Sequence, residues 1–348
     1  MAQSGTPGPA RPPRSGVGPT PQWRRASTTI WSLIAPFVGL LVVIGVFLLY
    51  QALFKPDVPF LSAFRMTLIT KQTAIVGMGA LGMTVIIISG GIDLSAGSLL
   101  ALTAVVLAVA LKAGVDPLLA VGLVLLVGIA AGAFNGVLIT GLRLVPFIVT
   151  LGTMLAFRGL AERVSDQKKV QAPAPDWLAT LLEPPGEESW QLVCTGVWLV
   201  LVLGVILTLV LRRTVFGRYV FALGSSEATA RLCGINVPAV KVAVYALGGA
   251  FMALAGILDF NNLNKQGSPT SGMGMELEMI AAVVIGGGSL SGGRGSVLGS
   301  IVGALTMTTL RNGCIYAGVS DPVQKIVIGL IIIAAVAIDQ LAHRGQDA

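Results

Sequence analysis

The sequence from Met66 to Ser89 reads MTLITKQTAIVGMGALGMTVIIIS and continues directly into GGIDLSAGS at residues 90–98. The first stretch carries one charged residue, Lys71, in a length that matches the roughly 20 residues needed to cross a bilayer as a helix. Lipid cannot satisfy exposed backbone groups, so only helices and closed barrels cross it. The apolar residues form a long block, unlike the alternating runs of a β-barrel. The sequence therefore predicts a membrane-spanning helix that breaks at the glycines.

The same pattern recurs along the chain of 348 residues, of which 54% are hydrophobic and only 11% are charged. Soluble proteins carry about 25% charged residues, and the mean hydropathy here is +0.85. We therefore predict an all-α polytopic integral membrane protein with about ten transmembrane helices. The predicted spans are Trp31–Phe54, Met66–Ser89, Gly97–Lys112, Pro117–Thr140, Pro146–Arg163, Leu192–Leu211, Val240–Phe260, Glu276–Ile285, Ser296–Ala317 and Val323–Leu341.

The charged residues outside these spans indicate the orientation. Residues 1–24 are rich in Pro, Gly, Ser and Arg, which predicts a disordered cytoplasmic tail before a transmembrane domain at 25–348. The apolar run that follows is too long for a signal peptide and lacks a cleavage site. Arginines at 24–25 and 212–218 lie inside by the positive-inside rule, and about ten spans then put both termini in the cytoplasm. The net charge of +7 is scattered over helix ends, which favours this topology over nucleic-acid binding.

Two loops are long enough to contact partners. The outer loop at 165–190 contains four prolines and is either a connector or a docking surface for an external protein. The cytoplasmic loop at 212–240 contains a short helix pattern, in which Ser225 or Ser226 can serve as N-cap and Gly234 can end the helix. Such a helix on the membrane surface either docks a partner or only joins two spans.

Asp93 lies in the glycine-rich break after the span at Met66–Ser89. Broken helices occur at membrane depth where they face protein or a water-filled cavity, and a carboxylate there is costly unless it is paired or hydrated. Asp93 is therefore a functional candidate. Its carboxylate can equally serve as an N-cap of the next helix.

A second Gly/Ser run at residues 286–296, GGGSLSGGRGS, resembles the first with a slip of one residue. Asn135-Gly136 before Pro146 is also similar to Asn312-Gly313 before Pro322. Both features are typical of an internal duplication of the kind transporters show, and shared Gly/Ser composition would mimic it. The run is not a phosphate-binding loop, because the chain contains no Gly-Lys pair.

The residues that would support catalysis or metal binding are scarce. Cys194, Cys233 and Cys314 lie in distant segments without a CxxC motif, which favours packing over a metal site or a disulfide. The only histidine, His343, is close to the C-terminus, so no His-dependent triad or zinc site can form in the spans. The sequence thus predicts no enzyme, no metal and no cofactor held by this chain.

Four stretches resemble the permease subunits of bacterial ribose/xylose/galactoside-type ABC importers: GGIDLSAGSLLAL, PFIVTLGTMLAFRGLA, TVFGRYVFALGSSEATARLCGINV and ELEMIAAVVIGGGSLSGGRGSVLGSIVGAL. The resemblance runs in order from about Thr70 to the C-terminus. It implies a permease dimer, of one chain or of two paralogues, in the lipid of the bacterial inner membrane. It also implies a cytoplasmic ATPase that hydrolyses the ATP and a periplasmic or lipid-anchored sugar-binding protein. The long N-terminal tail and the proline-rich outer loop depart from the family pattern.

The resemblance also implies roles for particular residues. Ser225–Ile235 matches the segment that docks on the ATPase, with Ser225, Ser226, Glu227, Ala228, Arg231 and Gly234 as its candidate contacts. Asp93 falls in the GIDLS motif and Glu276 in the EL-x-x-IAA motif. Together with polar residues in spans or breaks, they form the candidate substrate path: Asp93, Ser95, Ser98, Asn135, Thr150, Thr153 and Glu276.

The expected function is import of a monosaccharide or related polyol. Importers of nucleosides or branched-chain amino acids in the same superfamily are one alternative. The other is a secondary transporter, which would place ionisable residues in its spans for ion coupling. The few charges here disfavour it, and Arg158 and Glu162 stand four residues apart, a spacing that predicts a structural pair.

Overall fold

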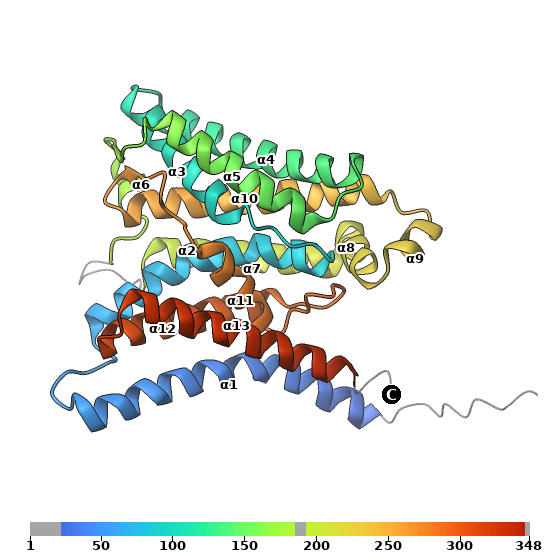
Figure 1. Ribbon diagram of the computed structural model, residues 1–348, viewed down its shortest axis with the longest axis horizontal. Helices are drawn as coiled ribbons and strands as arrows, with labels where there is room; N and C mark the ends of the chain where they lie inside the picture. Colours follow the sequence, from blue (N-terminus) through green and yellow to red (C-terminus); the bar gives the residue numbers. More distant parts are fainter. Residues whose placement is uncertain (1–21, 185–192, 345–348) are drawn as a thin grey trace, which may run out of the picture.

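The computed structural model describes residues 22–184 and 193–344, and it is helical almost throughout. Long helices lie along the longest axis of the molecule (Figure 1). The described residues form thirteen helices and two short strands, β1 (Val170–Gln171) and β2 (Gln266–Gly267), which pair antiparallel. The predicted helical class is confirmed, with this strand pair as an addition.

Each of the ten predicted spans coincides with a helix, and apart from the first start the ends agree to within about three residues. Helix α1 begins at Gln22, inside the stretch assigned to the tail, and residues 1–21 and 185–192 lie outside the described residues. The helices are α1 (Gln22–Phe54), α2 (Ala63–Ile88), α3 (Ala96–Lys112), α4 (Pro117–Gly141), α5 (Pro146–Val164), α7 (Thr195–Arg213), α10 (Val237–Asn262), α11 (Met275–Ile285), α12 (Val297–Ala317) and α13 (Asp321–Arg344).

Five of these helices are long and apolar enough to cross a membrane on their own, counted over the described parts of the chain. They are α2, α4, α7, α10 and the part of α1 from Pro36 to Phe54. Helix α3 is apolar but shorter, and α11 has 11 residues. Both short helices follow a non-helical segment, so each starts inside the bundle instead of at its surface (Figure 1).

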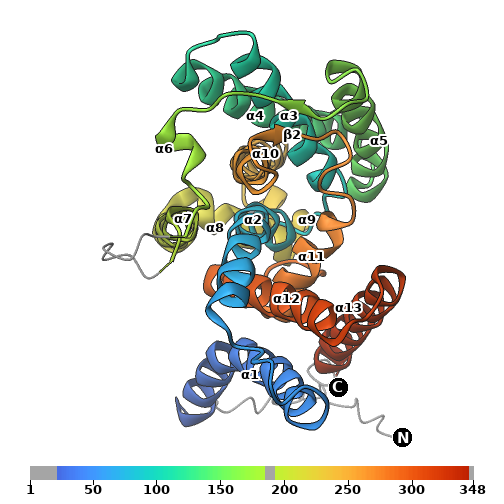
Figure 2. The ribbon, with the colours of Figure 1, turned by 90° about the vertical axis from the view of Figure 1, so that its left-hand side faces the viewer.

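Helices α2 and α10 form the centre of the bundle (Figure 2). In its most apolar window α2 is 89% buried by the rest of the chain, whereas α1 is 6% buried in the corresponding window. Helices α3, α4 and α11 to α12 pack around the central pair, and α1, α7 and α13 lie outside. Large apolar side chains such as Leu41 of α1, Leu126 of α4 and Val205 of α7 remain exposed. Since the chain spans a membrane, these side chains face lipid or another chain.

Small residues line the most extensive helix contact, between α4 and α10. A Cβ atom on Gly249 of α10 would overlap the backbone carbonyl of Gly128 in α4. Because glycine has no side chain, the two backbones touch directly. This close packing holds the helices together in lipid, where the hydrophobic effect does not. Glycine therefore has a packing role at this position.

The two ends of the bundle differ. One end carries the β1–β2 pair and the short helix α6 (Asp176–Ala179), both from the segment 165–184 and the link after α10 (Figure 1). The opposite end carries helices α8 (Val215–Ser225) and α9 (Glu227–Leu232), together with the start of α1 and the end of α13. The proposed outer and cytoplasmic loops therefore lie at opposite ends of the molecule.

The two Gly/Ser runs occupy different links in the fold. Residues 89–95 join α2 to α3, whereas residues 286–296 join α11 to α12. If one repeat begins with α2 and a second with α10, the link at 263–274 is the counterpart of the first run. The two runs are instead in contact, because a Cβ atom on Gly292 would overlap the Cα atom of Gly90. Their resemblance therefore does not arise from equivalent places in the chain.

Candidate functional site

The break between α2 and α3 is organised by Asp93, which is 1% exposed. Gly90 has a φ of +83°, a left-handed conformation that turns the chain away from α2 and back into the bundle. The Oδ1 atom of Asp93 accepts the backbone N–H of Ser95 at 2.8 Å and its hydroxyl at 2.6 Å. The carboxylate thus stabilises the turn before α3. It is not the N-cap that the alternative predicted, because Ser95 holds that position and α3 has no side-chain capping bond. Its other oxygen, Oδ2, is buried and has no hydrogen-bond partner among the described residues.

Polar side chains from α4 and α5 surround this turn. Asn135 donates from Nδ2 to the Ser95 hydroxyl at 2.9 Å, and its Oδ1 is buried without a partner in the described structure. Thr150 donates to Ile92 O at 3.3 Å, which connects α5 to the break. Ser98 and Thr153 donate to carbonyls within their own helices. These side chains are all buried.

The link between α10 and α11 passes the start of α3. A Cβ atom on Gly97 would overlap both the Glu276 carboxylate and the Gly272 carbonyl, so the link and the helix are in close contact. Arg158 of α5 donates to Pro269 O at 2.5 Å and to Ser271 O at 2.6 Å. The hydrogen bonds of Arg158 thus clamp the link, while Glu276 and Glu162 are the negative charges near its guanidinium.

Six of the seven predicted path residues thus lie on or against the start of α3, and Thr153 lies one turn along α5 from Thr150. The seven residues come from four segments of the sequence. Two buried acceptors there have no donor in the described structure. A buried polar group normally has a partner, because leaving it without one costs about 1–3 kcal/mol. The cluster is suited to accept hydroxyl or water hydrogens.

A second group of charged side chains was missed from the sequence. Asp259 of α10, Glu278 of α11 and Arg311 of α12 line a cavity of about 260 Å³ toward the end that carries α6. Asp259 and Arg311 are each the only charged residue in their neighbourhood of an apolar helix, and that isolation was the available signal, whereas Glu278 stands two residues after Glu276.

At the opposite end, the predicted short helix is present as α9. Ser226 is its N-cap, with its hydroxyl oxygen accepting the Thr229 N–H at 3.2 Å, while Ser225 belongs to the end of α8. Gly234, with a φ of +80°, follows the last turn and donates to Arg231 O at 3.1 Å. The side chain of Leu232 is 88% exposed. The helix α8 before it was not predicted.

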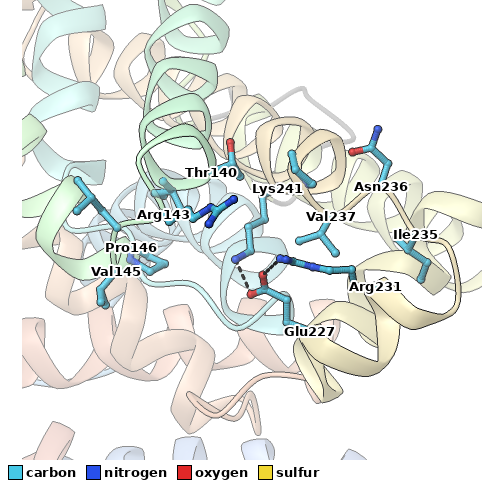
Figure 3. A pocket seen from close by; sticks show the side chains of 13 residues that line it. Thr140, Arg143, Val145, Pro146, Glu227, Arg231, Ile235, Asn236, Val237 and Lys241 are labelled. Carbon is cyan, nitrogen blue, oxygen red and sulfur yellow. Dashed lines mark hydrogen bonds and ion pairs between the residues drawn. The ribbon is translucent and has the colours of Figure 1, made fainter.

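Helix α9 borders a groove of about 660 Å³ that α10 and the turn between α4 and α5 complete (Figure 3). Glu227 binds Arg231 at 3.0 Å and Lys241 at 2.7 Å, and Arg143 points toward the same space. The Lys241 ammonium, with Arg231, holds the pKa of Glu227 below its usual value against the effect of partial burial. Three cations and one carboxylate give the groove a positive balance.

A contact that we call the glycine junction joins this end to the break. It consists of Gly90, Gly224, Gly292 and Gly293. A Cβ atom on Gly224, at the end of α8, would overlap both Ile88 O and Gly293 N. Helix α8 therefore lies directly on the last turn of α2, immediately before the segment that contains Asp93.

Polar groups buried at a helix break within an apolar bundle are typical of proteins that move a polar solute across a membrane. The class is therefore a multi-pass membrane transport protein. The model of the family described as branched-chain amino acid transport system / permease component matches residues 65–336, and the chain belongs to this family.

Relatives in this family are similar over most of their length. The chain is 38% identical to the ribose import permease protein RbsC of Bacillus subtilis (strain 168), covering 88% of this chain and 92% of the relative. It is 40% identical to the ribose import permease protein RbsC of Escherichia coli (strain K12), covering 78% and 84%. It is 38% identical to the fructose import permease protein FrcC of Rhizobium meliloti, covering 81% and 79%. No solved structure matches the chain.

Proposed function

We propose that this chain is the membrane-spanning subunit of an ATP-driven importer for a monosaccharide or a related polyol. The observation that carries this proposal is its identity of 38% to 40%, over most of both chains, to ribose import permeases. The buried polar cluster at the start of α3 supports it, because sugar hydroxyls can donate to acceptors such as Asp93 Oδ2 and Asn135 Oδ1. The chain is a transport component and not itself an enzyme.

The energy would come from a partner. The sequence has no Gly-Lys pair and hence no phosphate-binding loop, so we assign ATP hydrolysis to a separate cytoplasmic ATPase and no cofactor to this chain. Helix α9 is the proposed docking element, with Leu232 exposed for an apolar contact and the positive groove for acidic groups. The candidate contacts remain Ser225, Ser226, Glu227, Ala228, Arg231 and Gly234.

The other partners follow from the relatives and from the exposed surface. We propose that a sugar-binding protein delivers substrate at the end that carries α6. A second permease chain, identical or paralogous, would cover part of the outer face. Lipid would cover the rest. The end with α9 and both described termini would be cytoplasmic, and all ten predicted spans would be membrane helices, with α3 and α11 continuing the extended links before them.

The same order of elements supports an internal duplication with opposite orientation. Helices α2 to α5 and α10 to α13 each comprise a long helix, a non-helical link, a shorter helix, a long helix and a helix that begins near a proline. Asn135-Gly136 lies in α4 and Asn312-Gly313 in α12, which are counterparts in this order. Helices α4 and α12 run in opposite directions along the bundle (Figure 1).

The proposed mechanism is alternating access. ATP binding would draw the partner ATPases together and displace α9, and α8 would transmit this movement to the end of α2 through the glycine junction. The break at Asp93 would then shift relative to α4 and α5. A path of this kind binds its solute weakly, because tight binding would slow release.

The family description names branched-chain amino acids. An amino-acid importer would differ from the proposed sugar importer in its substrate. The relatives named above are described for ribose and fructose, which favours sugars. A secondary transporter would use an ion gradient instead of ATP, so the energy source distinguishes it from the proposed importer.

Co-purification tests the central partner. The tagged chain is purified from native membranes in mild detergent, beside a variant with Glu227→Lys and Arg231→Glu. A P-loop ATPase that accompanies the natural chain and is lost from the variant supports the proposal. An intact natural chain that binds no ATPase contradicts it.

A further inference from the structure

The cavity of about 260 Å³ lies among α2, α10, α11, α12 and the link at 263–274. Gln72 lies nine residues from the start of α2, or about 14 Å along the helix. Asp259 lies three residues from the end of α10, or about 5 Å. The cavity is therefore set inside the bundle, below the end that carries α6. It shares no lining residue with the cluster around Asp93, although Gly272, which lines it, contacts Gly97 at the start of α3.

The two carboxylates in this cavity are buried and held in place. Asp259 is 4% exposed and accepts the Ser271 hydroxyl, and Glu278 is 8% exposed and binds Arg311 at 3.1 Å. A single charge at bilayer depth costs roughly 2.5–3.5 kcal/mol, so such residues face a water-filled or functional space. A structural ion pair alone would explain Glu278 and Arg311. It does not explain why Asp259 lines the same space.

Uncharged polar groups complete the lining. Thr270 and Asn262 border the cavity, and Asn312 donates to Gln72 Oε1 at 2.8 Å, which fixes the amide at its edge. Carboxylates, amides and hydroxyls around one space are the groups that bind the hydroxyls of a sugar. The volume equals that of about nine water molecules, which is comparable to the ten non-hydrogen atoms of a pentose.

The cavity also has an approach from the outer end. A second cavity of about 340 Å³ is lined by Lys71, Asn261 and Asn262, so Asn262 borders both spaces. The Oδ1 atom of Asn261 is buried and has no partner in the described residues. Arg311 is 40% exposed on the surface of the single chain. A cation at this depth faces water or protein instead of lipid.

We propose that the cavity lined by Gln72, Asp259, Glu278 and Arg311 is a binding site for one monosaccharide on its way from the outer end to the cluster at Asp93. This inference rests on the proposed function. The carboxylates accept hydrogen bonds from the sugar hydroxyls, Arg311 donates to them, and Asn261 and Asn262 mark the entrance. The site is distinct from the substrate path predicted from the sequence.

Cysteine labelling of the complete complex in membranes tests the site. The three natural cysteines are replaced by alanine, and Thr270→Cys or, as a second variant, Asn262→Cys is introduced. A membrane-impermeant thiol reagent is added from outside, with and without saturating ribose or fructose. Asp57→Cys, exposed outside the cavity, is the matched control.

We expect the sugar to slow labelling of Thr270→Cys by roughly fivefold or more and to leave Asp57→Cys unchanged. Glu278→Gln should remove this protection and reduce uptake roughly tenfold or more, because a hydrogen bond to a charged group is lost. The site is refuted if the complex transports the sugar while both cavity cysteines are unlabelled or are labelled at the same rate with sugar. If the complex takes up no monosaccharide or polyol with ATP, the proposed function is refuted and the proposed site with it.

Discussion

Replacing Gly224 by valine should uncouple ATP hydrolysis from uptake. The new Cβ atom would overlap Ile88 O and Gly293 N, so α8 must move away from the end of α2. Overpacking of this kind costs about 1–3 kcal/mol. The hydrogen bond from Gly293 N to Ile88 O, 2.8 Å long, would be strained or lost, which adds about 1 kcal/mol. The sum of about 2–4 kcal/mol lowers the population of the closed glycine junction roughly 30- to 1,000-fold.

The assay compares sugar uptake with ATP hydrolysis in the reconstituted complex. Since α9 itself is unchanged, the variant should still bind the ATPase and hydrolyse ATP, while uptake falls at least tenfold. Gly141→Val is the matched control, because Gly141 ends α4 at the same end of the molecule and a Cβ atom there meets no neighbour within 4 Å. Normal uptake by Gly224→Val, at normal expression, would refute transmission through the junction.

Three further predictions concern the same elements. Ser226→Ala removes the N-cap of α9 and should destabilise that helix by about 1 kcal/mol, seen as faster hydrogen exchange at residues 227–232; unchanged exchange would contradict the capping role. Glu227 has a pKa below the ordinary 4.5, so its contribution to stability is present above that pH and is lost as the pH falls through the lower folded pKa. Thermal unfolding should therefore depend less on pH in this acidic range for Glu227→Gln, and equal dependence in both proteins would count against the two ion pairs. Gly249→Leu should separate α4 from α10 and reduce the folded yield in mild detergent, whereas Gly122→Leu, where a Cβ atom meets no neighbour within 4 Å, should not; equal yields would argue against the close contact.

The helices of this protein are predictable from its sequence because lipid imposes one requirement on every span. A block of apolar residues must hydrogen-bond its own backbone, and this places α2, α4 and α10 to within about three residues. The ends of α9 are also predictable from local sequence, because Ser226 and Gly234 lie within a few residues of the helix ends that they set. Helix α8 was not predicted because only one residue, Thr214, separates it from α7.

The cavity was not predictable because its lining depends on how distant helices pack. Gln72 and Asn312 are 240 residues apart in the sequence and are joined by one hydrogen bond. The clamp by Arg158 shows the same limit. Its spacing from Glu162 suggested a pair within one helix, whereas its hydrogen bonds go to two backbone carbonyls of the link. The cluster at Asp93 was easier, because three of its groups, Asp93, Ser95 and Ser98, lie in one glycine-rich motif.

Transport by the reconstituted complex tests the account most directly. The chain, its co-purified ATPase and its sugar-binding protein are incorporated into liposomes, and uptake of labelled ribose or fructose is measured with ATP or with an ion gradient alone. We predict uptake that requires both ATP and the binding protein and that a gradient alone does not drive. Uptake driven by the gradient in the absence of ATP would contradict the account and identify a secondary transporter.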